Sequence, residues 1–329
     1  MTLRKGLQFG LGLLLASLFL WLTVRHIEPG DLAAGLARAN VAGIACAVLA
    51  VIVGYSCRIE RWRLMLLSAN PNLRWSVSAG PLLASFAANN VLPFRAGDVL
   101  RAFAFNTQLG TTPGVVLATV FVERLLDLLT VLGLLGVAMA AFGRNAAGVV
   151  GVSGLLLLVV VAAVSLVLLV PNVMTPLVRA LAKCAARWLP RMAQRISHET
   201  DRSLATLEHL AGGGRMRTLV LWSVAAWTAE GCAYWLTASS FPSLAEPLAA
   251  WLALPVGALA TLVPSSPGYV GTFDYFTAQA MTALGNDRPS STLFALVIHA
   301  VVWLPPTLGG GIYLLIRSIK ASNRNAFAS

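Results

Sequence analysis

The chain has 329 residues, of which 57% are hydrophobic and only 11% are charged, and its mean hydropathy is +0.77. Soluble globular proteins carry about 25% charged residues, so this composition excludes an ordinary soluble protein. The net charge of +11 does not call for a nucleic-acid partner, because the cytoplasmic loops of membrane proteins are rich in Lys and Arg, and we expect none.

Six stretches are nearly free of charge and long enough to cross a hydrocarbon layer of roughly 30 Å. They are 7–24, 41–57, 113–142, 147–170, 217–240 and 291–316. Because lipid offers no partner to open backbone groups, we predict an all-α polytopic membrane protein. It would form a single integral membrane domain over 1–329, with a first half of about 1–142 and a second half of about 147–320. No signal-cleavage site follows the first stretch before Arg25, so we expect an uncleaved span.

Two further apolar regions, 79–112 and 248–288, are each interrupted by proline and glycine. The interruptions are LPFRAG at 92–97 and VPSSPG at 263–268. An apolar arm, a break and a second short arm are typical of a re-entrant hairpin, although two short full spans fit the same pattern. The expected fold is therefore about six full transmembrane helices with two broken or re-entrant hairpins.

Basic residues concentrate in 58–78, in 171–216 and after residue 316. By the positive-inside rule these segments and both termini face the cytoplasm, and we expect a bacterial cytoplasmic (inner) membrane. Within 171–216 five bases recur every four residues: Arg179, Lys183, Arg187, Arg191 and Arg195. This spacing favours a cytoplasmic amphipathic connection that rests on anionic headgroups over a plain basic loop.

The same charge count places the two breaks on opposite sides of the membrane. Pro93 and Pro264 are 171 residues apart, and so are Gly97 and Gly268. This match is compatible with an inverted repeat, with which many transporters build a site at mid-membrane. A chance match of this length is the alternative.

A polar cluster begins at the first break and continues into the stretch 113–142. Its members are Asn90, Arg95, Asp98, Arg101, Glu123, Arg124 and Asp127. A charge at the bilayer centre costs about 2.5–3.5 kcal/mol, so these groups must be paired or hydrated. One interpretation is a polar cavity whose guanidinium groups bind an anionic headgroup, since Arg grips phosphate bidentately and stays charged. The other is an ion-pair network that pins the hairpin, for example Arg95 or Arg101 with Glu123 or Asp127, and one site can do both.

The second break offers hydroxyl groups and one acid, at Ser265, Tyr269 and Asp274. They suit a zwitterionic or sugar-bearing headgroup, and they equally suit hydrogen bonding to freed backbone groups. Glu230 and His299 lie inside other apolar stretches, and we interpret His299 as structural. The carboxylates are too few and too compensated for a metal, and the four cysteines lack CxxC or Cys/His spacing. We therefore expect no metal and no cofactor.

Four motifs occur in order along the chain: RIERW at 58–62, NVLPFRAGDVLR at 90–101, ERLLD at 123–127 and PSSPGYVGTFD at 264–274. On these motifs the chain resembles, over about residues 5–320, the lysylphosphatidylglycerol synthase transmembrane-region family, also called flippase-like. The resemblance implies an integral membrane protein. In the multiple-peptide-resistance proteins a similar domain translocates aminoacylated phosphatidylglycerol, which a separate soluble domain makes. We expect a stand-alone member without a synthase domain.

Two positions depart from the family's pattern. Tyr269 stands where a second glycine is common, and Asp274 stands where Glu is common. We therefore expect the site near the second break to differ in shape and reach, which affects the substrate more than the fold.

The residues and the resemblance together predict a lipid transporter, or flippase, that moves a phospholipid or other polar-headgroup lipid through a polar cavity. The alternatives are an integral membrane enzyme that modifies a lipid headgroup and a small-solute or ion transporter. We expect no enzyme, because the sequence has no HExxH, nucleophile elbow or GxxxxGK motif. The expected partner is a membrane lipid with an anionic or zwitterionic headgroup. Gly6 and Gly10, spaced as GxxxG, are compatible with a homodimer.

Overall fold

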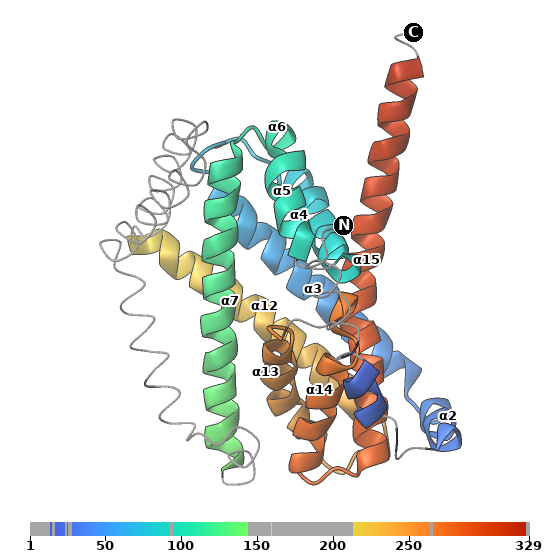
Figure 1. Ribbon diagram of the computed structural model, residues 1–329. Coiled ribbons are helices and arrows are strands. Elements are labelled where there is room, and N and C mark those ends of the chain that lie inside the picture. Colours follow the sequence, from blue (N-terminus) through green and yellow to red (C-terminus); the bar gives the residue numbers. More distant parts are fainter. Residues whose placement is uncertain are drawn as a thin grey trace.

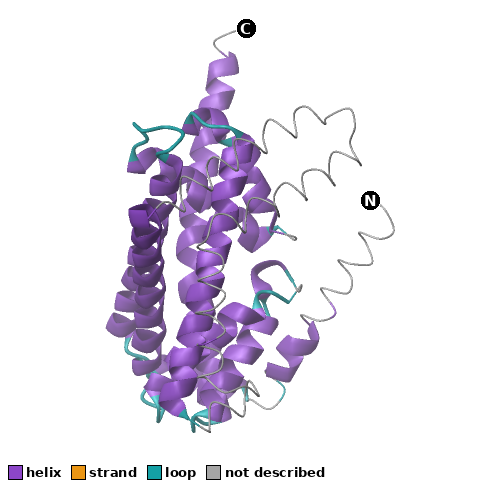
Figure 2. Ribbon diagram, turned by 90° about the vertical axis from the view of Figure 1, so that its left-hand side faces the viewer, coloured by secondary structure: helices purple, strands orange, loops and turns teal. Residues whose placement is uncertain are grey.

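The computed structural model of the chain describes residues 14, 17–23, 25, 28–92, 95–143, 159, 213–263 and 266–326. Within these residues every regular element is a helix (Figures 1 and 2), which confirms the all-α prediction. Several predictions fall outside the described residues: most of the span 7–24, nearly all of the span 147–170 and of the connection 171–216, and the pair Gly6 and Gly10.

The long helices agree with the predicted spans. In chain order the elements are α2 (Pro29–Ala37), α3 (Val41–Leu66), α4 (Trp75–Val91), α5 (Ala96–Ala104), α6 (Asn106–Leu109), α7 (Pro113–Phe142), α12 (Gly213–Ser239), η3 (Pro247–Ala249), α13 (Ala250–Ala260), η4 (Pro267–Tyr269), α14 (Thr272–Ala283) and α15 (Arg288–Ala326). In this part of the chain, α3, α7 and α15 are long and apolar enough to cross a membrane. The helix predicted at 217–240 is present as α12, although α12 is not among those three.

Capping residues set the ends of the spanning helices. The Asn40 side chain accepts hydrogen bonds from the Ala42 and Gly43 amides at 3.1 and 3.2 Å and so begins α3. Thr112 caps α7 in the same way, and Pro113 follows at the first helical position, where its missing N–H costs nothing. The helix starts are therefore encoded locally.

α4 and α5 form one hairpin, and α13 and α14 form the other. In Figure 1, α4 and α5 lie toward one end of the bundle, where α3 ends and α7 begins. α13 and α14 lie toward the other end, where α12 ends and α15 begins. The interruptions predicted at 92–97 and 263–268 are confirmed as breaks between helices.

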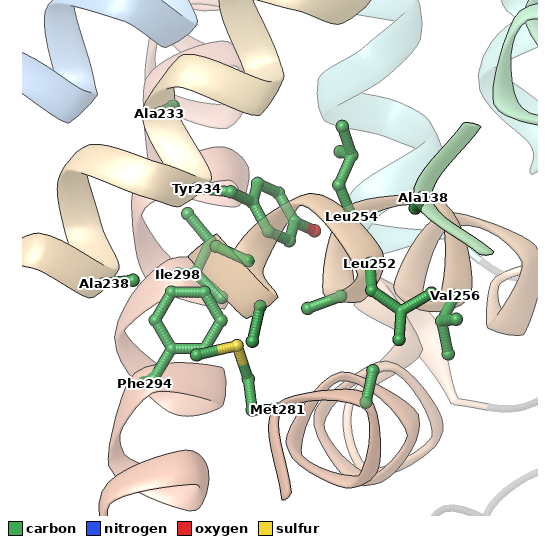
Figure 3. Close-up of a cluster of buried hydrophobic side chains, with 14 of the residues drawn as sticks. Ala138, Ala233, Tyr234, Ala238, Leu252, Leu254, Val256, Met281, Phe294 and Ile298 are labelled. Atoms are coloured by element: carbon green, nitrogen blue, oxygen red, sulfur yellow. The ribbon is translucent and has the colours of Figure 1, made fainter. Parts of the chain in front are cut away.

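Each hairpin has its own hydrophobic core. The first core packs α4 and α5 against α3 and α7, with Trp62, Leu82 and Phe105 fully or nearly fully buried. The second core gathers α12, α13, α14 and α15, and Figure 3 shows Tyr234 beside Leu254 within it.

One predicted boundary is wrong. We placed the end of the second apolar stretch at residue 57 and assigned 58–78 to the cytoplasmic side, but α3 continues to Leu66 with Arg58 and Arg61 buried. Arg58, Arg61 and Trp62 recur at i, i+3 and i+4 and therefore share one helix face. Carboxylates from other helices neutralise the two arginines. Counting charges along the sequence therefore ends the helix too early.

Candidate functional site

A cavity of about 370 Å³ lies between the two breaks. Its charged wall residues are Arg58, Arg95, Arg124, Asp127 and Glu230. Its aromatic wall residues are Tyr55, Phe86, Trp227, Tyr234, Tyr269, Phe273 and Trp303. An apolar chamber with a few convergent polar groups is typical of a ligand site.

The first break is shaped by a close contact between α4 and α5. A Cβ at Gly97 would collide with the Ser85 carbonyl oxygen, so only glycine lets the two helices approach this closely. Asn89 fixes the contact, because its side-chain oxygen accepts from the Gly97 amide at 2.8 Å while its amide donates to Asp98 Oδ1 at 3.0 Å. Arg95 starts α5 in the left-handed conformation, at φ 51° and ψ 40°. This uncommon backbone conformation accompanies a side chain that lines the cavity.

Two ion pairs join the first hairpin to α7. Arg101 donates to both oxygens of Glu123 at 3.1 Å, and the two side chains are 0% and 1% exposed. Arg124 donates to both oxygens of Asp98 at 2.9 and 3.0 Å. Pairing of this kind is what makes buried charge tolerable.

Two more ion pairs join α3 to its neighbours. Arg61 donates to Asp127 Oδ1 on α7 and to Ser223 Oγ on α12, both at 2.7 Å. Arg58 donates to Glu230 Oε2 on α12 at 2.6 Å. The cluster is therefore a network that ties four helices together.

Arg95 differs from these four arginines. Each of the others is paired with its own carboxylate, whereas Arg95 has no ion pair and no side-chain hydrogen bond among the described residues. The cavity wall is thus neutral except for one guanidinium. Such a wall can receive one negative charge without leaving another charge unpaired.

Aromatic rings cover several of the guanidinium groups. The Trp227 ring lies 4.9 Å from the Arg58 guanidinium carbon, and the Trp62 ring lies 4.9 Å from that of Arg101. The Trp227 indole also donates to Asp127 Oδ1 at 3.1 Å. Stacking stabilises cations away from water, so the rings hold the paired arginines in place.

The second break meets the first hairpin. Gly268 has φ +70°, and a Cβ there would lie 2.9 Å from Trp303 Nε1 and 3.2 Å from the Asn90 carbonyl oxygen. Asn90, at the end of α4, donates in turn to Thr307 Oγ1 on α15 at 2.8 Å. The two breaks therefore meet at the wall of the cavity.

His299 links the second break to α15. Its Nδ1 lies 2.8 Å from Asp274 Oδ1, and its Nε2 lies 2.9 Å from the Gly268 carbonyl oxygen. Asp274 is buried at the start of α14, where its other oxygen accepts from the Gly271 amide at 2.8 Å. His299 also lines the cavity, in addition to making these structural contacts.

Most of the predicted site residues come together. Asn90, Arg95, Arg124, Asp127 and Tyr269 line the cavity. Asp98, Arg101 and Glu123 lie behind its wall as ion-pair partners, Asp274 contacts it through His299, and Ser265 lies outside the described residues. Of the pairings considered, Arg95 or Arg101 with Glu123 or Asp127, the structure has Arg101 with Glu123, whereas Asp127 pairs with Arg61.

Sequence reasoning missed part of the cavity. It placed Arg58 and Arg61 in a cytoplasmic segment and left Glu230 out of the site, although Arg58 and Glu230 pair with each other and both line the cavity. The i, i+3, i+4 spacing of Arg58, Arg61 and Trp62 could have indicated that the helix continues, because it places the three side chains on one helix face.

Comparisons with known proteins point to a membrane-protein family. The family model described as "Lysylphosphatidylglycerol synthase TM region" matches residues 10–310. One curated relative, "Glycosyltransferase AglD" of Haloferax volcanii, is 27% identical over 330 aligned positions. The match covers 92% of this chain and 53% of the relative, so the chain spans about half the length of that protein.

Proposed function

The chain belongs to the family of the lysylphosphatidylglycerol synthase transmembrane region, a membrane-protein family, and we propose that it moves a lipid with a phosphate-bearing headgroup across the membrane. The observation that carries the proposal is the cavity between the two breaks, where Arg95 has no carboxylate partner among the described residues. Charged groups within membrane proteins are costly and mark substrate paths.

The headgroup phosphate would bind Arg95. Asn90 and Tyr269 lie in the same wall and offer further polar contacts. The volume of about 370 Å³ is near the lower end of the roughly 300–1,000 Å³ of ligand sites, which suits a headgroup whose acyl chains stay in the bilayer. One unpaired guanidinium matches the single negative charge of a phosphodiester, so anionic and zwitterionic phospholipids are both candidates.

Alternating access would follow from the two hairpins. We propose that about six full helices surround two re-entrant hairpins, which enter from opposite sides and are related as an inverted repeat. Figure 1 supports this arrangement, because α4 with α5 and α13 with α14 lie at opposite ends of the bundle. Movement of one hairpin would open the cavity to one side only.

Charge supports an orientation in the cytoplasmic membrane. The end at which α3 and α15 finish and α12 begins is basic, with Arg63, Arg74, Arg215, Arg217, Arg317 and Lys320. The opposite end is close to neutral, with Glu28, Asp31, Glu246 and Asp287 against Arg25, Arg38 and Arg288. The positive-inside rule would place the basic end and both termini in the cytoplasm.

A headgroup-modifying enzyme is the second candidate, and the name of the relative "Glycosyltransferase AglD" favours it. The distinction is chemical: an enzyme leaves a new covalent product, whereas a transporter relocates an unchanged lipid. Lipid analysis by mass spectrometry after incubation with isotope-labelled headgroup donors separates the two. A third class, a small-solute or ion transporter, predicts flux that does not depend on the lipid supplied.

The test is relocation of headgroup-labelled phospholipid in proteoliposomes. The purified full chain should move label between leaflets, and Arg95→Ala should slow the movement by at least about tenfold, because the loss of a charge-assisted contact of about 1.5–3 kcal/mol is expected. Arg38→Ala is the matched control, since Arg38 is exposed at the end of α2 and lines no part of the cavity. Equal rates for wild type, Arg95→Ala and Arg38→Ala would overturn the proposed site.

A further inference from the structure

His299 lies between two groups that act as hydrogen-bond acceptors. The Gly268 carbonyl oxygen, 2.9 Å from Nε2, can only accept. Asp274 Oδ1 lies 2.8 Å from Nδ1, and the other carboxyl oxygen already accepts from the Gly271 amide. A neutral imidazole carries one N–H, which cannot serve both nitrogens.

For both contacts to be hydrogen bonds, the pair must hold one proton beyond neutral His299 and ionised Asp274. Either both imidazole nitrogens are protonated beside a carboxylate, or Nε2 carries the hydrogen and Asp274 Oδ1 donates to Nδ1. The two arrangements differ only in the position of one proton along a 2.8 Å contact. Both contacts persist only while that proton is bound.

We infer that His299 and Asp274 form a proton-binding site that locks the second break onto α15. Loss of the proton would set two lone pairs against each other, at Asp274 or at Gly268 depending on the tautomer. In either case one of the two hydrogen bonds from His299 to the second hairpin is lost. The ligand of the site is a proton, and its release frees the second break.

The proton-binding site holds Gly268, which lies where the second break contacts both α15 and the first hairpin. Gly268 holds φ +70° and packs against Trp303 on α15 and against the Asn90 carbonyl of the first hairpin. Loss of the hydrogen bond between its carbonyl and His299 would therefore weaken the contact between the two breaks. The effect on lipid movement rests on the proposed function, whereas the proton site itself does not.

Other titratable and charged groups face the same cavity from the surrounding elements. They are Tyr55 and Arg58 from α3, Arg95 from the first break, Arg124 and Asp127 from α7, Glu230 and Tyr234 from α12, and Tyr269 from η4. α4 and α13 contribute only uncharged side chains to this cavity, and α2, which also packs against α15, contributes none. Within the described residues, Asp274 is the one titratable side chain that contacts a His299 nitrogen.

Asp274→Asn gives a sharp test, because asparagine can keep every contact without the extra proton. Its Oδ1 can accept from the Gly271 amide, its Nδ2 can donate to His299 Nδ1, and Nε2–H can still donate to Gly268. This variant should therefore keep both His299 contacts to the second hairpin at every pH. His299→Ala removes both contacts, so the second break should be free of α15 at this point at every pH.

The proton is measured by nuclear magnetic resonance of the full chain in lipid nanodiscs, labelled with 15N-histidine and 13C-aspartate, over an acidic-to-alkaline series. The chain has four histidines, and comparison with His299→Ala assigns the signal of His299. We expect the wild-type pair to lose one proton within the series and the pair in Asp274→Asn to lose none. A singly protonated His299 beside an ionised Asp274 at every pH would overturn the inference.

Lipid relocation in proteoliposomes gives the second readout. The wild-type rate should rise with pH by up to about tenfold per pH unit, the limit for release of one proton. Asp274→Asn should be slow and His299→Ala fast, both without pH dependence. Asp287→Asn is the matched control with the wild-type profile, because Asp287 also accepts a backbone amide at a helix start but lies away from the cavity.

The two proposals fail separately. Lipid that moves with the same pH profile in wild type and Asp274→Asn would overturn the lock and leave the transport proposal standing. No lipid movement under any condition would overturn the transport proposal, and the spectra would still decide whether the proton site exists.

Discussion

Removal of the Glu123 charge tests whether the ion-pair network holds the first hairpin in place. Glu123→Gln keeps the shape of the side chain but leaves the Arg101 guanidinium, which is 0% exposed, without its bidentate partner. Breaking a buried pair from one side costs about 3–5 kcal/mol, because an uncompensated charge stays behind. Asp98, 3.7 Å from Arg101, retains part of the attraction, so we expect a cost near the lower end, about 3 kcal/mol.

The assay is reversible unfolding of the purified chain in mixed detergent micelles, with the free energy of unfolding as the measured quantity. Glu60→Gln is the control, because Glu60 pairs with Arg63 at 2.6 Å with side chains about one fifth exposed. A pair of that kind contributes about 0.2–1 kcal/mol. The double variant Arg101→Met, Glu123→Leu should recover to within about 1 kcal/mol of wild type, since apolar residues of similar volume can replace a buried pair. A loss in Glu123→Gln no larger than that in Glu60→Gln would refute the reasoning.

Two further predictions concern packing and pairing around the cavity. Gly97→Ala should lower the free energy of unfolding by about 1–3 kcal/mol, because the new methyl group collides with the Ser85 carbonyl. Gly133→Ala on α7 is its control and should be neutral or raise stability by up to about 1 kcal/mol, since nothing lies within 4 Å. Arg58→Met should cost about 3 kcal/mol by leaving Glu230 unpaired, and Glu230→Gln in the same chain should restore most of it. Unfolding titrations of these variants check both predictions. The first is wrong if Gly97→Ala and Gly133→Ala change the free energy of unfolding equally. The second is wrong if Glu230→Gln does not restore the stability that Arg58→Met loses.

The breaks and the helix boundaries were largely predictable from sequence because their causes are local. The clustered proline and glycine near 93–97 and 264–268 favour an interruption of helical hydrogen bonding, whereas the isolated prolines Pro81 and Pro255 lie inside α4 and α13. Asn40 and Thr112 cap the helices that follow them. That an arginine of the first hairpin pairs with an acid of the next span was also predictable, but the sequence left open whether Arg95 or Arg101 pairs with Glu123 or Asp127.

The remaining pairs depend on tertiary packing. Arg58 reaches Glu230, which is 172 residues away in the chain, because α3 packs along α12. Positive-inside counting cannot separate a loop arginine from one neutralised inside the protein, so it ended α3 too early. His299 was interpreted as structural for a similar reason: its partners Asp274 and Gly268 meet it only when α14 and α15 lie side by side.

The central claim is that a lipid headgroup occupies the cavity at Arg95. The most direct measurement is photo-crosslinking of the full chain in nanodiscs with a phospholipid that carries a diazirine on its headgroup, followed by peptide mass spectrometry. We predict labelling of cavity-wall residues such as Tyr269 and Trp303, lost in Arg95→Ala and kept in Arg38→Ala. Labelling confined to exposed apolar positions such as Leu221 and Leu315, with the same pattern in both variants, would contradict the account.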